Sequence, residues 1–201
     1  MKLGLITDIH EHVVNLKAAL DALQKQQVDQ IVVIGDLLEM GQRIEETCKL
    51  LADAKVIGVW GNHDFGLCGD DVHPDYRMRY SPAVFDYLNT LCARLVVKDC
   101  YFAHIEPWLN PEDIVDLWYF DGVPDSKEKL DRIFKNAPNR IMFAGHYHRW
   151  LAATPSELLD WNGERPLRLD QGPHFVVINA LCEGSFATFD TVTSELVPYQ
   201  L

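Results

Sequence analysis

The fold can be predicted from one segment, KLGLITDIHEHVVNLKAALDALQKQQVDQIVVIGD, residues 2–36. It opens with an apolar, partly β-branched run that is typical of a buried strand. Apolar residues then recur at helical spacing, and a second buried strand, DQIVVIGD, completes the unit. The helically spaced residues are Val13, Leu16, Ala19, Leu20 and Leu23. A helix between two buried strands predicts a right-handed crossover that makes the strands parallel.

The same alternation continues once more along the chain. The segment RIEETCKLLADA, residues 43–54, has the spacing of an amphipathic helix, and KVIGVWGNHD, residues 55–64, reads as a third strand. Strand–helix–strand–helix–strand predicts a parallel sheet that is covered by helices.

The rest of the chain is less regular. Residues 65–81 combine Gly, Pro and mixed charge, which predicts a long loop or a small cap. Further elements are predicted as follows: a helix at 81–92 capped by Ser81 with Pro82 in its first turn, a hairpin turning near Lys98–Asp99, a helix at 126–137 capped by Ser126, and a strand at 140–146. Four strand-like segments near the end, PLRLD, HFVVINA, SFATFD and SELVPY, are expected to be antiparallel. We therefore predict an α/β fold of the four-layer α+β type, with two packed mixed β-sheets flanked by α-helices in a single domain, residues 1–201.

Composition and charge exclude several classes of protein. The 201 residues suit one domain with a full core. A formal net charge of −12 argues against a face for double-stranded nucleic acid, which needs clustered Lys and Arg. A phosphorylated substrate stays open, because bound cations can reverse the local charge.

The cysteines and the hydropathy indicate where the protein works. Five scattered cysteines, with no C-x-x-C pair, are typical of reduced thiols. The N-terminus has no signal-peptide pattern, and no apolar run approaches the roughly 20 residues of a membrane span. We expect a cytoplasmic protein that makes no membrane contact, and we leave a monomer and a homodimer both open.

Each predicted buried strand is followed by polar residues that can bind a ligand. In order along the chain these are Asp8 and His10, then Asp36, then Asn62, His63 and Asp64, then His104, and finally His146 and His148. Ligands bind outside the carboxyl ends of strands in open α/β sheets, so these residues should converge. Three of the motifs have a glycine just before the polar group, which we expect to permit a tight turn.

The chemistry of this set favours metal ions. Asp and Asn oxygens together with imidazole nitrogens suit Mn, Fe, Zn or Ni. The motifs contain no cysteine, which disfavours a zinc site made of thiolates. Seven candidate ligands exceed one tetrahedral site. If two ions share one carboxylate, they lie about 3.5–4 Å apart.

The motifs resemble those of the calcineurin-like metallophosphoesterases, in particular the compact bacterial and archaeal branch. The family pattern is D-x-H, G-D, G-N-H-D/E, a lone H and G-H-x-H. This chain carries all five motifs in order, between residues 8 and 148: Asp8-x-His10, Gly35-Asp36, Gly61-Asn62-His63-Asp64, His104 and Gly145-His146-x-His148.

The resemblance implies a role for each motif residue. Asp8, His10 and His148 would bind one ion. Asn62, His104 and His146 would bind a second ion, and Asp36 would bridge the two. The ions would be two divalent metals among Mn, Fe, Zn and Ni, with Fe(III) as an alternative for one of them.

The resemblance also implies an enzyme, a phosphoric ester hydrolase. Its bridging hydroxide would attack a small phosphate mono- or diester in line. His63, oriented by Asp64, would protonate the leaving group. Asn62, His63 and Gly41 are the expected substrate contacts. The alternatives are a metal-binding scaffold of the same fold, a serine/threonine protein phosphatase and a nuclease; Trp60, where many relatives have arginine, weakens the protein-phosphatase alternative.

Three further features bear on the substrate. Glu11 replaces a glycine that is common in relatives, and we expect it to narrow the entrance and to add negative charge near the phosphate. His12 is either a polar contact in the site or a solvated residue at the helix start, which is the favoured interpretation. The aromatics of DLWYFDG, residues 116–122, and Trp108 either line a pocket for a nucleobase or aryl group or pack in the core, and core packing is favoured.

Overall fold

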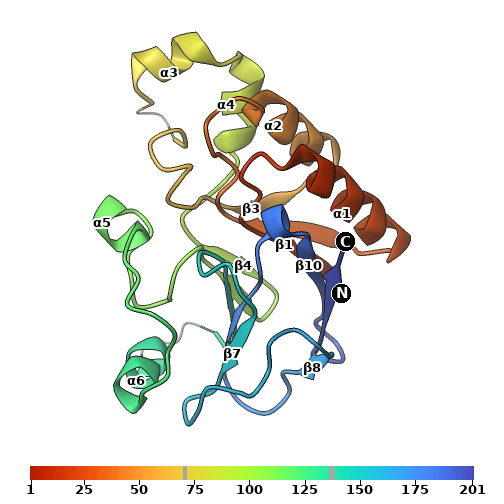
Figure 1. Ribbon diagram of the computed structural model, residues 1–201, viewed down its shortest axis with the longest axis vertical. Coiled ribbons are helices and arrows are strands. Elements are labelled where there is room, and N and C mark those ends of the chain that lie inside the picture. Colours follow the sequence, from red (N-terminus) through yellow and green to blue (C-terminus); the bar gives the residue numbers. More distant parts are fainter. Residues whose placement is uncertain (70–71, 136–138) are drawn as a thin grey trace.

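Two β-sheets pack face to face, and helices cover their outer faces (Figure 1). The computed structural model describes residues 1–69, 72–135 and 139–201. The first sheet has the order β3 (Ile57–Val59), β2 (Gln30–Ile34), β1 (Lys2–Ile6), β10 (Ser185–Asp190), β11 (Glu195–Gln200), β8 (Leu167–Arg168). The second has the order β4 (Leu95–Val97), β5 (Cys100–Phe102), β6 (Ile141–Ala144), β9 (His174–Val177), β7 (Leu151–Ala153).

Both sheets are mixed, which confirms the predicted fold class. In the first sheet β1, β2 and β3 are parallel, and β10, β11 and β8 continue from β1 as antiparallel neighbours. In the second sheet β5, β6 and β9 are parallel, whereas β4 and β7 are antiparallel to their neighbours. The hairpin predicted near Lys98–Asp99 joins β4 to β5.

One strand direction was predicted wrongly. The segment HFVVINA contains β9, which was expected to be antiparallel but runs parallel to β6. The intervening chain contains β7, a short strand that was not predicted, and it reverses the direction of the chain before β9 begins. A three-residue strand carries too little alternation to be recognised from its pattern.

The helices of the described residues are α1 (Val13–Lys25), α2 (Ile44–Asp53), α3 (Pro74–Arg79), α4 (Pro82–Leu88), α5 (Ile114–Leu117), α6 (Lys127–Lys135) and a 3₁₀ helix, Leu181–Glu183. The helix α3 lies inside the segment predicted as a loop or cap, of which residues 70–71 lie outside the description. The predicted end of the 126–137 helix also lies outside it. Ser81 precedes α4 as predicted, but its side chain forms no capping hydrogen bond in the described structure.

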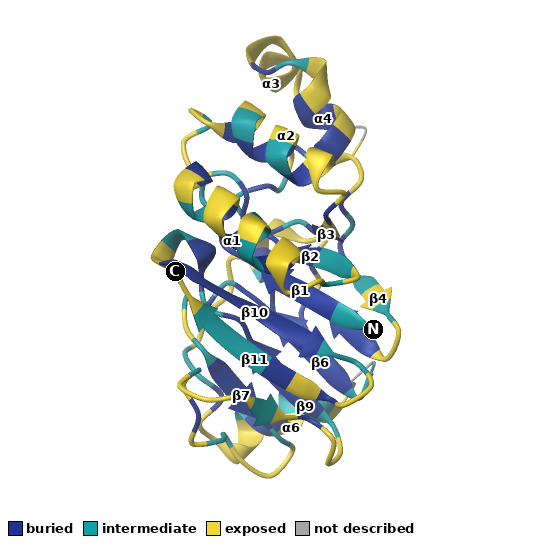
Figure 2. Ribbon diagram, turned by 90° about the vertical axis from the view of Figure 1, so that its right-hand side faces the viewer, coloured by how far each residue is buried: buried dark blue, intermediate teal, exposed yellow. Residues whose placement is uncertain are grey.

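Apolar side chains join the four layers. Between the sheets, the Phe143 ring of β6 lies 5.3 Å from Phe102 and 5.3 Å from Phe189 of the first sheet (centroid distances). On the outer face of the first sheet, α1 buries Leu16 and Leu23 completely, and each contributes about 1.5–3 kcal/mol to stability. Figure 2 shows the exposed residues of α1 turned away from the sheet.

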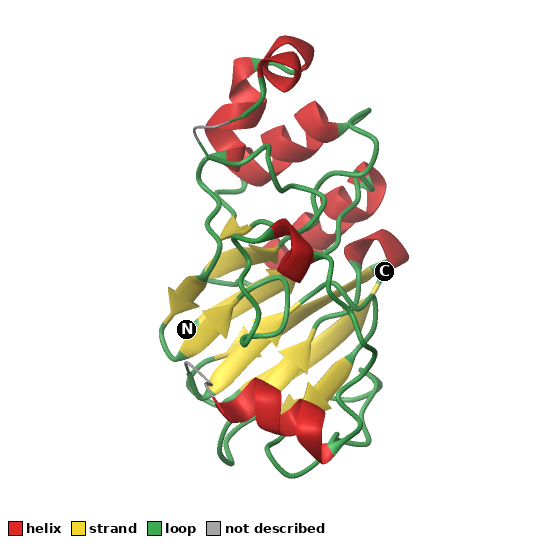
Figure 3. Ribbon diagram, turned by 90° about the vertical axis from the view of Figure 1, so that its left-hand side faces the viewer, coloured by secondary structure: helices red, strands yellow, loops and turns green. Residues whose placement is uncertain are grey.

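The second sheet is covered on its outer face by α6, which lies across its strands in Figure 3. Ile133 of α6 is fully buried in a cluster with Phe175 and Met142. Within the described residues, no helix combines the length and the apolar character that crossing a bilayer requires.

Candidate metal centre

The loops after five strands meet where the two sheets adjoin. The Asp8 N–H donates to Gly35 O at 3.0 Å, which joins the loops after β1 and β2. The Gly145 N–H donates to His104 O at 3.1 Å, which joins the loops after β6 and β5. The structure thereby brings together all seven side chains that were predicted as ligands.

These side chains form two groups that could each hold a metal ion. Ligand atoms of Asp8, His10 and His148 lie within 4.8 Å of one another. The same holds for Asp36, His104 and His146. His148 thus lies in the first group and His146 in the second, while a third, overlapping group consists of His10, Asp36 and His63.

Asn62 completes the second group. Its Oδ1 lies 3.1 Å from His104 Nε2 and 3.0 Å from His146 Nδ1. In the first group, His148 Nε2 lies 3.2 Å from His10 Nε2 and 3.3 Å from Asp8 Oδ1. In each group, donor atoms converge from different loops at distances that suit a shared cation.

Asp36 lies between the two groups. Its Oδ2 is 3.8 Å from His10 Nε2 and 3.3 Å from His104 Nε2. Its other oxygen, Oδ1, accepts a hydrogen bond from the His63 N–H at 3.0 Å. One carboxylate oxygen thus faces both groups, and the backbone holds the other in place.

Asp8 provides a test of whether a cation fits. Its Oδ2 accepts hydrogen bonds from Thr7 Oγ1 at 2.7 Å and from the His146 N–H at 3.1 Å. Its Oδ1 is buried and has no hydrogen-bond partner among the described residues. Leaving such an oxygen unpaired costs about 1–3 kcal/mol or more, and a bound cation would remove that cost. The donor set therefore fits a metal ion.

In His104 and His10, the ring nitrogen that faces away from the centre has its own polar partner, which orients the imidazole. His104 Nδ1 lies 2.7 Å from Ile34 O, so this nitrogen donates and Nε2 is the nitrogen that faces the centre. His10 Nδ1 lies 3.2 Å from Leu38 O and 2.9 Å from a carboxylate oxygen of Glu39. Carbonyl and carboxylate partners of this kind fix the tautomer and the ring direction of a metal ligand.

Burial and neighbouring charges shift the pKa values of three histidines in the centre in different directions. Burial lowers the pKa of His104, but the Asp36 carboxylate outweighs burial and raises that pKa to about 9. The Asp8 carboxylate, whose Oδ1 lies 3.3 Å from His148 Nε2, and next the Cys182 thiol raise the pKa of His148 to about 10, whereas burial lowers the pKa of His146 to about 4. The pKa values of the two neighbouring histidines thus shift in opposite directions, and an ion bound by either one requires its neutral form.

Most of the predicted ligands have strained backbones. Left-handed φ values between 44° and 69° occur at Asp8, His10, Asp36, His146 and His148. Each such residue other than glycine costs about 1–3 kcal/mol, and such strain clusters at functional sites. The strain is the means by which short loops aim consecutive side chains at one point.

The three motif glycines serve two different purposes. Only Gly35 has the positive φ, 90°, that the predicted tight turn requires. Gly61 and Gly145 lack it and are needed for space instead. A Cβ at Gly61 would collide with Asp36 Oδ1, and one at Gly145 would collide with Thr7 Oγ1.

The centre opens into a cavity of about 580 Å³. Six predicted site residues line it: His10, Asp36, Asn62, His63, His146 and His148. Four more line it that were not predicted as site residues: His12, Glu39, Trp118 and Cys182. No Lys or Arg is among the described lining residues.

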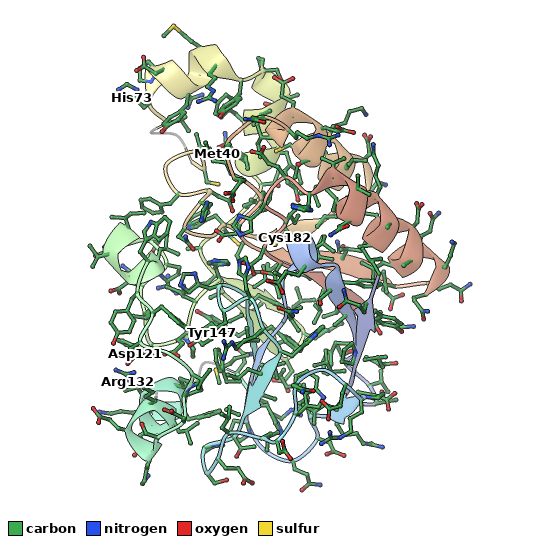
Figure 4. All side chains as sticks on the ribbon, in the orientation of Figure 1. Met40, His73, Asp121, Arg132, Tyr147 and Cys182 are labelled. Atoms are coloured by element: carbon green, nitrogen blue, oxygen red, sulfur yellow. The ribbon has the colours of Figure 1, made fainter. Side chains whose placement is uncertain are left out.

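Two of these residues, His12 and Trp118, line the cavity although the sequence favoured other positions for them. His12, favoured as a solvated residue, is exposed and also lines the cavity, and Trp118 lines it although core packing was favoured. Cys182, labelled in Figure 4, comes from the 3₁₀ helix, whose Cys182 N–H donates to Asp8 O at 3.0 Å. No motif precedes Cys182, so local pattern could not have revealed it.

Asp64 has a different contact from the one expected. Its fully buried carboxylate accepts hydrogen bonds from the N–H groups of Leu37 at 2.9 Å, Leu38 at 3.1 Å and Gly61 at 2.9 Å. In the described structure no hydrogen bond joins it to His63. Asp64 therefore ties the loop after β2 to the loop after β3, which corrects the expectation that it orients His63.

Glu11 and Gly41 also lie elsewhere than expected. Glu11 does not narrow the entrance, because its carboxylate is buried and accepts four backbone hydrogen bonds from residues 39–43. One of them comes from Gly41, which does not line the cavity and whose Cβ would collide with the Tyr80 hydroxyl. Gly41 therefore serves the packing of this loop instead of a substrate contact.

Comparisons with known proteins agree with this architecture. A crystal structure of a metallophosphoesterase from Sphaerobacter thermophilus superposes with a TM-score of 0.79 at 22% identity and covers 100% of this chain and 88% of that one. A novel archaeal phosphodiesterase gives a TM-score of 0.57 at 16% identity, with both chains covered in full. A putative diadenosine tetraphosphatase gives 0.60 at 17%, covering 99% and 93%. These likenesses show the fold.

Sequence comparison shows the family. An uncharacterized protein of Methanocaldococcus jannaschii is 31% identical over 78 residues, which is 39% of this chain and only 32% of that protein. The family model of the calcineurin-like phosphoesterase superfamily domain matches residues 1–179. With that match over most of its length, the chain belongs to the calcineurin-like phosphoesterase superfamily.

Proposed function

We propose that this protein hydrolyses small phosphate mono- or diesters with the help of two divalent metal ions. The observation that carries the proposal is the position of Asp36 Oδ2, which faces His10 and His104 of two separate ligand groups. The buried Asp8 Oδ1, which accepts no hydrogen bond from the described residues, supports it, because a cation is the natural partner of such an oxygen.

Each ion would have four protein ligands. Asp8, His10, Asp36 and His148 would hold the first, and Asp36, Asn62, His104 and His146 the second. When bound, two such ions lower the pKa of a hydrolytic water and neutralise phosphoryl oxygens. The donor types suit Mn, Fe, Zn or Ni, including Fe(III) at one position. Because no described lining residue is Lys or Arg, the protein itself offers no permanent cation to a phosphate.

His63 is the proposed proton donor to the leaving group. It lines the cavity, and its ring lies 4.8 Å from the His10 ring, beside the first ligand group. Its backbone is fixed by the hydrogen bond to Asp36, so the imidazole extends from a rigid point. Asn62 and His63 are the proposed contacts for the phosphoryl group and the leaving group.

Hydrolysis of p-nitrophenyl phosphate and its bis ester tests the proposal. We expect turnover of at least one of them when Mn, Ni, Fe or Zn is supplied, and its loss when a chelator removes the metal. Metal analysis should find two ions per chain. Absence of hydrolysis with all four metals, in a protein that binds them, would count against a phosphoesterase.

Replacing His63 with glutamine should separate substrates by their leaving groups. We expect kcat/KM for alkyl esters to fall about 10²–10⁴-fold, because an alkoxide needs a proton as it departs. Esters of p-nitrophenol should lose far less, since this phenol leaves readily without one. The control is His73→Gln, at a largely exposed histidine of the α3 N-terminus. Equal losses for both kinds of ester would contradict the assigned role.

A further inference from the structure

We propose that Trp118 binds a flat aromatic ring in the leaving group, so that the preferred substrates are phosphate esters of nucleosides or aryl alcohols. The inference rests on the proposed function and names the substrate class for the same site. It starts from a tryptophan that lines the cavity of the metal centre and keeps 56% of its surface exposed.

The ring of Trp118 stands beside the proposed proton donor. Its centroid lies 5.3 Å from the His63 ring, at an interplanar angle of 43°. The His63 ring in turn lies 4.8 Å from His10. An alcohol that receives its proton from His63 would therefore leave next to the indole of Trp118.

The segment that carries Trp118 is firmly anchored. Leu117 is fully buried, and the Asp113 carboxylate caps α5 by accepting from the Val115 N–H at 2.8 Å. Beyond the tryptophan, Asp121 accepts hydrogen bonds from Arg132 at 2.7 Å and from the Tyr119 hydroxyl at 3.1 Å; Asp121 and Arg132 are labelled in Figure 4. The backbone that carries the indole is thus anchored, while the indole itself stays 56% exposed.

The two aromatic residues that follow Trp118 differ from it, because each packs edge-on against another aromatic ring. The Tyr119 ring packs edge-on against Trp108 at 5.5 Å, and the Phe120 ring packs edge-on against Tyr147 at 5.0 Å. Among the described residues, the one ring contact of Trp118 is with His63. An indole next to a polar centre whose one ring neighbour is an imidazole of that centre can stack on a ligand.

Charge narrows the ligand further. With no Lys or Arg among the described lining residues and with Glu39 at the wall, the cavity gives no cationic partner to further anionic groups. The part of the substrate beyond the phosphoryl group should therefore be uncharged. A nucleobase and an aryl ring share this chemistry, since both are neutral, planar and able to stack.

The experiment compares three monoesters in wild type and Trp118→Ala. Adenosine 5′-monophosphate and ribose 5-phosphate have the same leaving oxygen and differ in the base, while phenyl phosphate carries an aryl ring. We expect Trp118→Ala to lower kcat/KM about 5- to 100-fold for a ring-bearing ester and to leave ribose 5-phosphate within about 2-fold. Trp118→Phe should retain most of the preference.

The two kinds of ring, a nucleobase and an aryl group, are distinguished by comparing how far Trp118→Ala lowers kcat/KM for adenosine 5′-monophosphate and for phenyl phosphate. Each decrease is the ratio of wild type to variant with the same substrate, so the difference in leaving-group pKa between the substrates cancels. Val115→Ala is the matched control, because Val115 lies on the same short helix, is 72% exposed and does not line the cavity. It should change none of the three ratios.

A second readout is independent of turnover. Saturation-transfer NMR should show contact of the protein with the base protons of free adenosine in wild type and in Trp118→Phe, and much less in Trp118→Ala. Metal content should be the same in all variants. If neither these monoesters nor p-nitrophenyl phosphate and its bis ester are hydrolysed, the proposed function fails, while the NMR result still tests the stacking.

Other results would overturn the inference. Equal losses for all three esters, or none, would do so even if hydrolysis itself is observed. A changed oligomeric state of Trp118→Ala in light scattering, with unchanged substrate ratios, would instead assign the exposed side chains of residues 114–120 to an interface between copies.

Discussion

Replacing Asp36 with asparagine is expected to lower kcat/KM by about 10³-fold or more. The Oδ2 atom faces both ligand groups, and Oδ1 holds the loop that carries His63. An amide at this position removes the negative charge shared by two proposed cations and places at least one N–H group against cations or against a donor. A loss of about 4 kcal/mol in transition-state stabilisation corresponds to this factor.

The measurement is kcat/KM for p-nitrophenyl esters together with metal content per chain. We expect the variant to keep its fold by circular dichroism but to bind fewer than two ions. Asp53→Asn, on the exposed part of α2, is the matched control and should behave as wild type. A variant at Asp36 that keeps both ions and most of its activity would refute the bridging role.

Replacing Glu11 with glutamine is expected to reduce the free energy of unfolding by about 3 kcal/mol. The buried carboxylate accepts hydrogen bonds from the N–H groups of Glu39 (3.2 Å), Gly41 (2.6 Å), Gln42 (2.9 Å) and Arg43 (2.8 Å), two at each oxygen. Glutamine keeps one acceptor and turns an N–H₂ group toward the other two donors. Hydrogen bonds to a charged group contribute about 1.5–3 kcal/mol each, and the negative charge also stabilises the N-terminus of α2.

The same variant should bind metal more weakly. Residues 38–43 form the loop that Glu11 holds, and Leu38 O and the Glu39 carboxylate orient His10 from that loop. Urea denaturation and metal titration measure the two effects. Glu46→Gln, at a partly exposed glutamate with surface ion pairs, is the control and should lose much less stability. If both variants lose equally little, Glu11 does not organise this loop.

Local sequence pattern was sufficient to predict much of the fold of this protein. The spacing of apolar residues in 2–36 and 43–64 predicted β1, α1, β2, α2 and β3 and their parallel directions. Such a prediction works because buried residues recur every 3.6 positions in a helix, whereas in a strand they alternate or form a continuous run. The polar residues that follow these strands could be named as one site for a related reason. Each lies directly after a strand, and parallel strands end at the same edge of a sheet.

The contacts between distant segments were not accessible in this way. The direction of β9 depends on how the chain returns from β6 through β7, and no residue within β9 encodes it. Asp64 and Glu11 look like charged residues at the mouth of a site, yet both turn inward to backbone N–H groups of other loops.

The layered α/β fold and the set of side chains around the candidate metal centre could be predicted from the sequence, since they follow from periodicity and from residues adjacent to strand ends. The surroundings of that centre could not: the hydrogen-bond partners of its loops and the exposed indole of Trp118 at its wall are visible only in the folded chain. Periodicity acts between residues a few positions apart, whereas contacts such as Leu37–Asp64 and Asp8–His146 join residues 27 and 138 positions apart, whose proximity exists only after the sheets have packed.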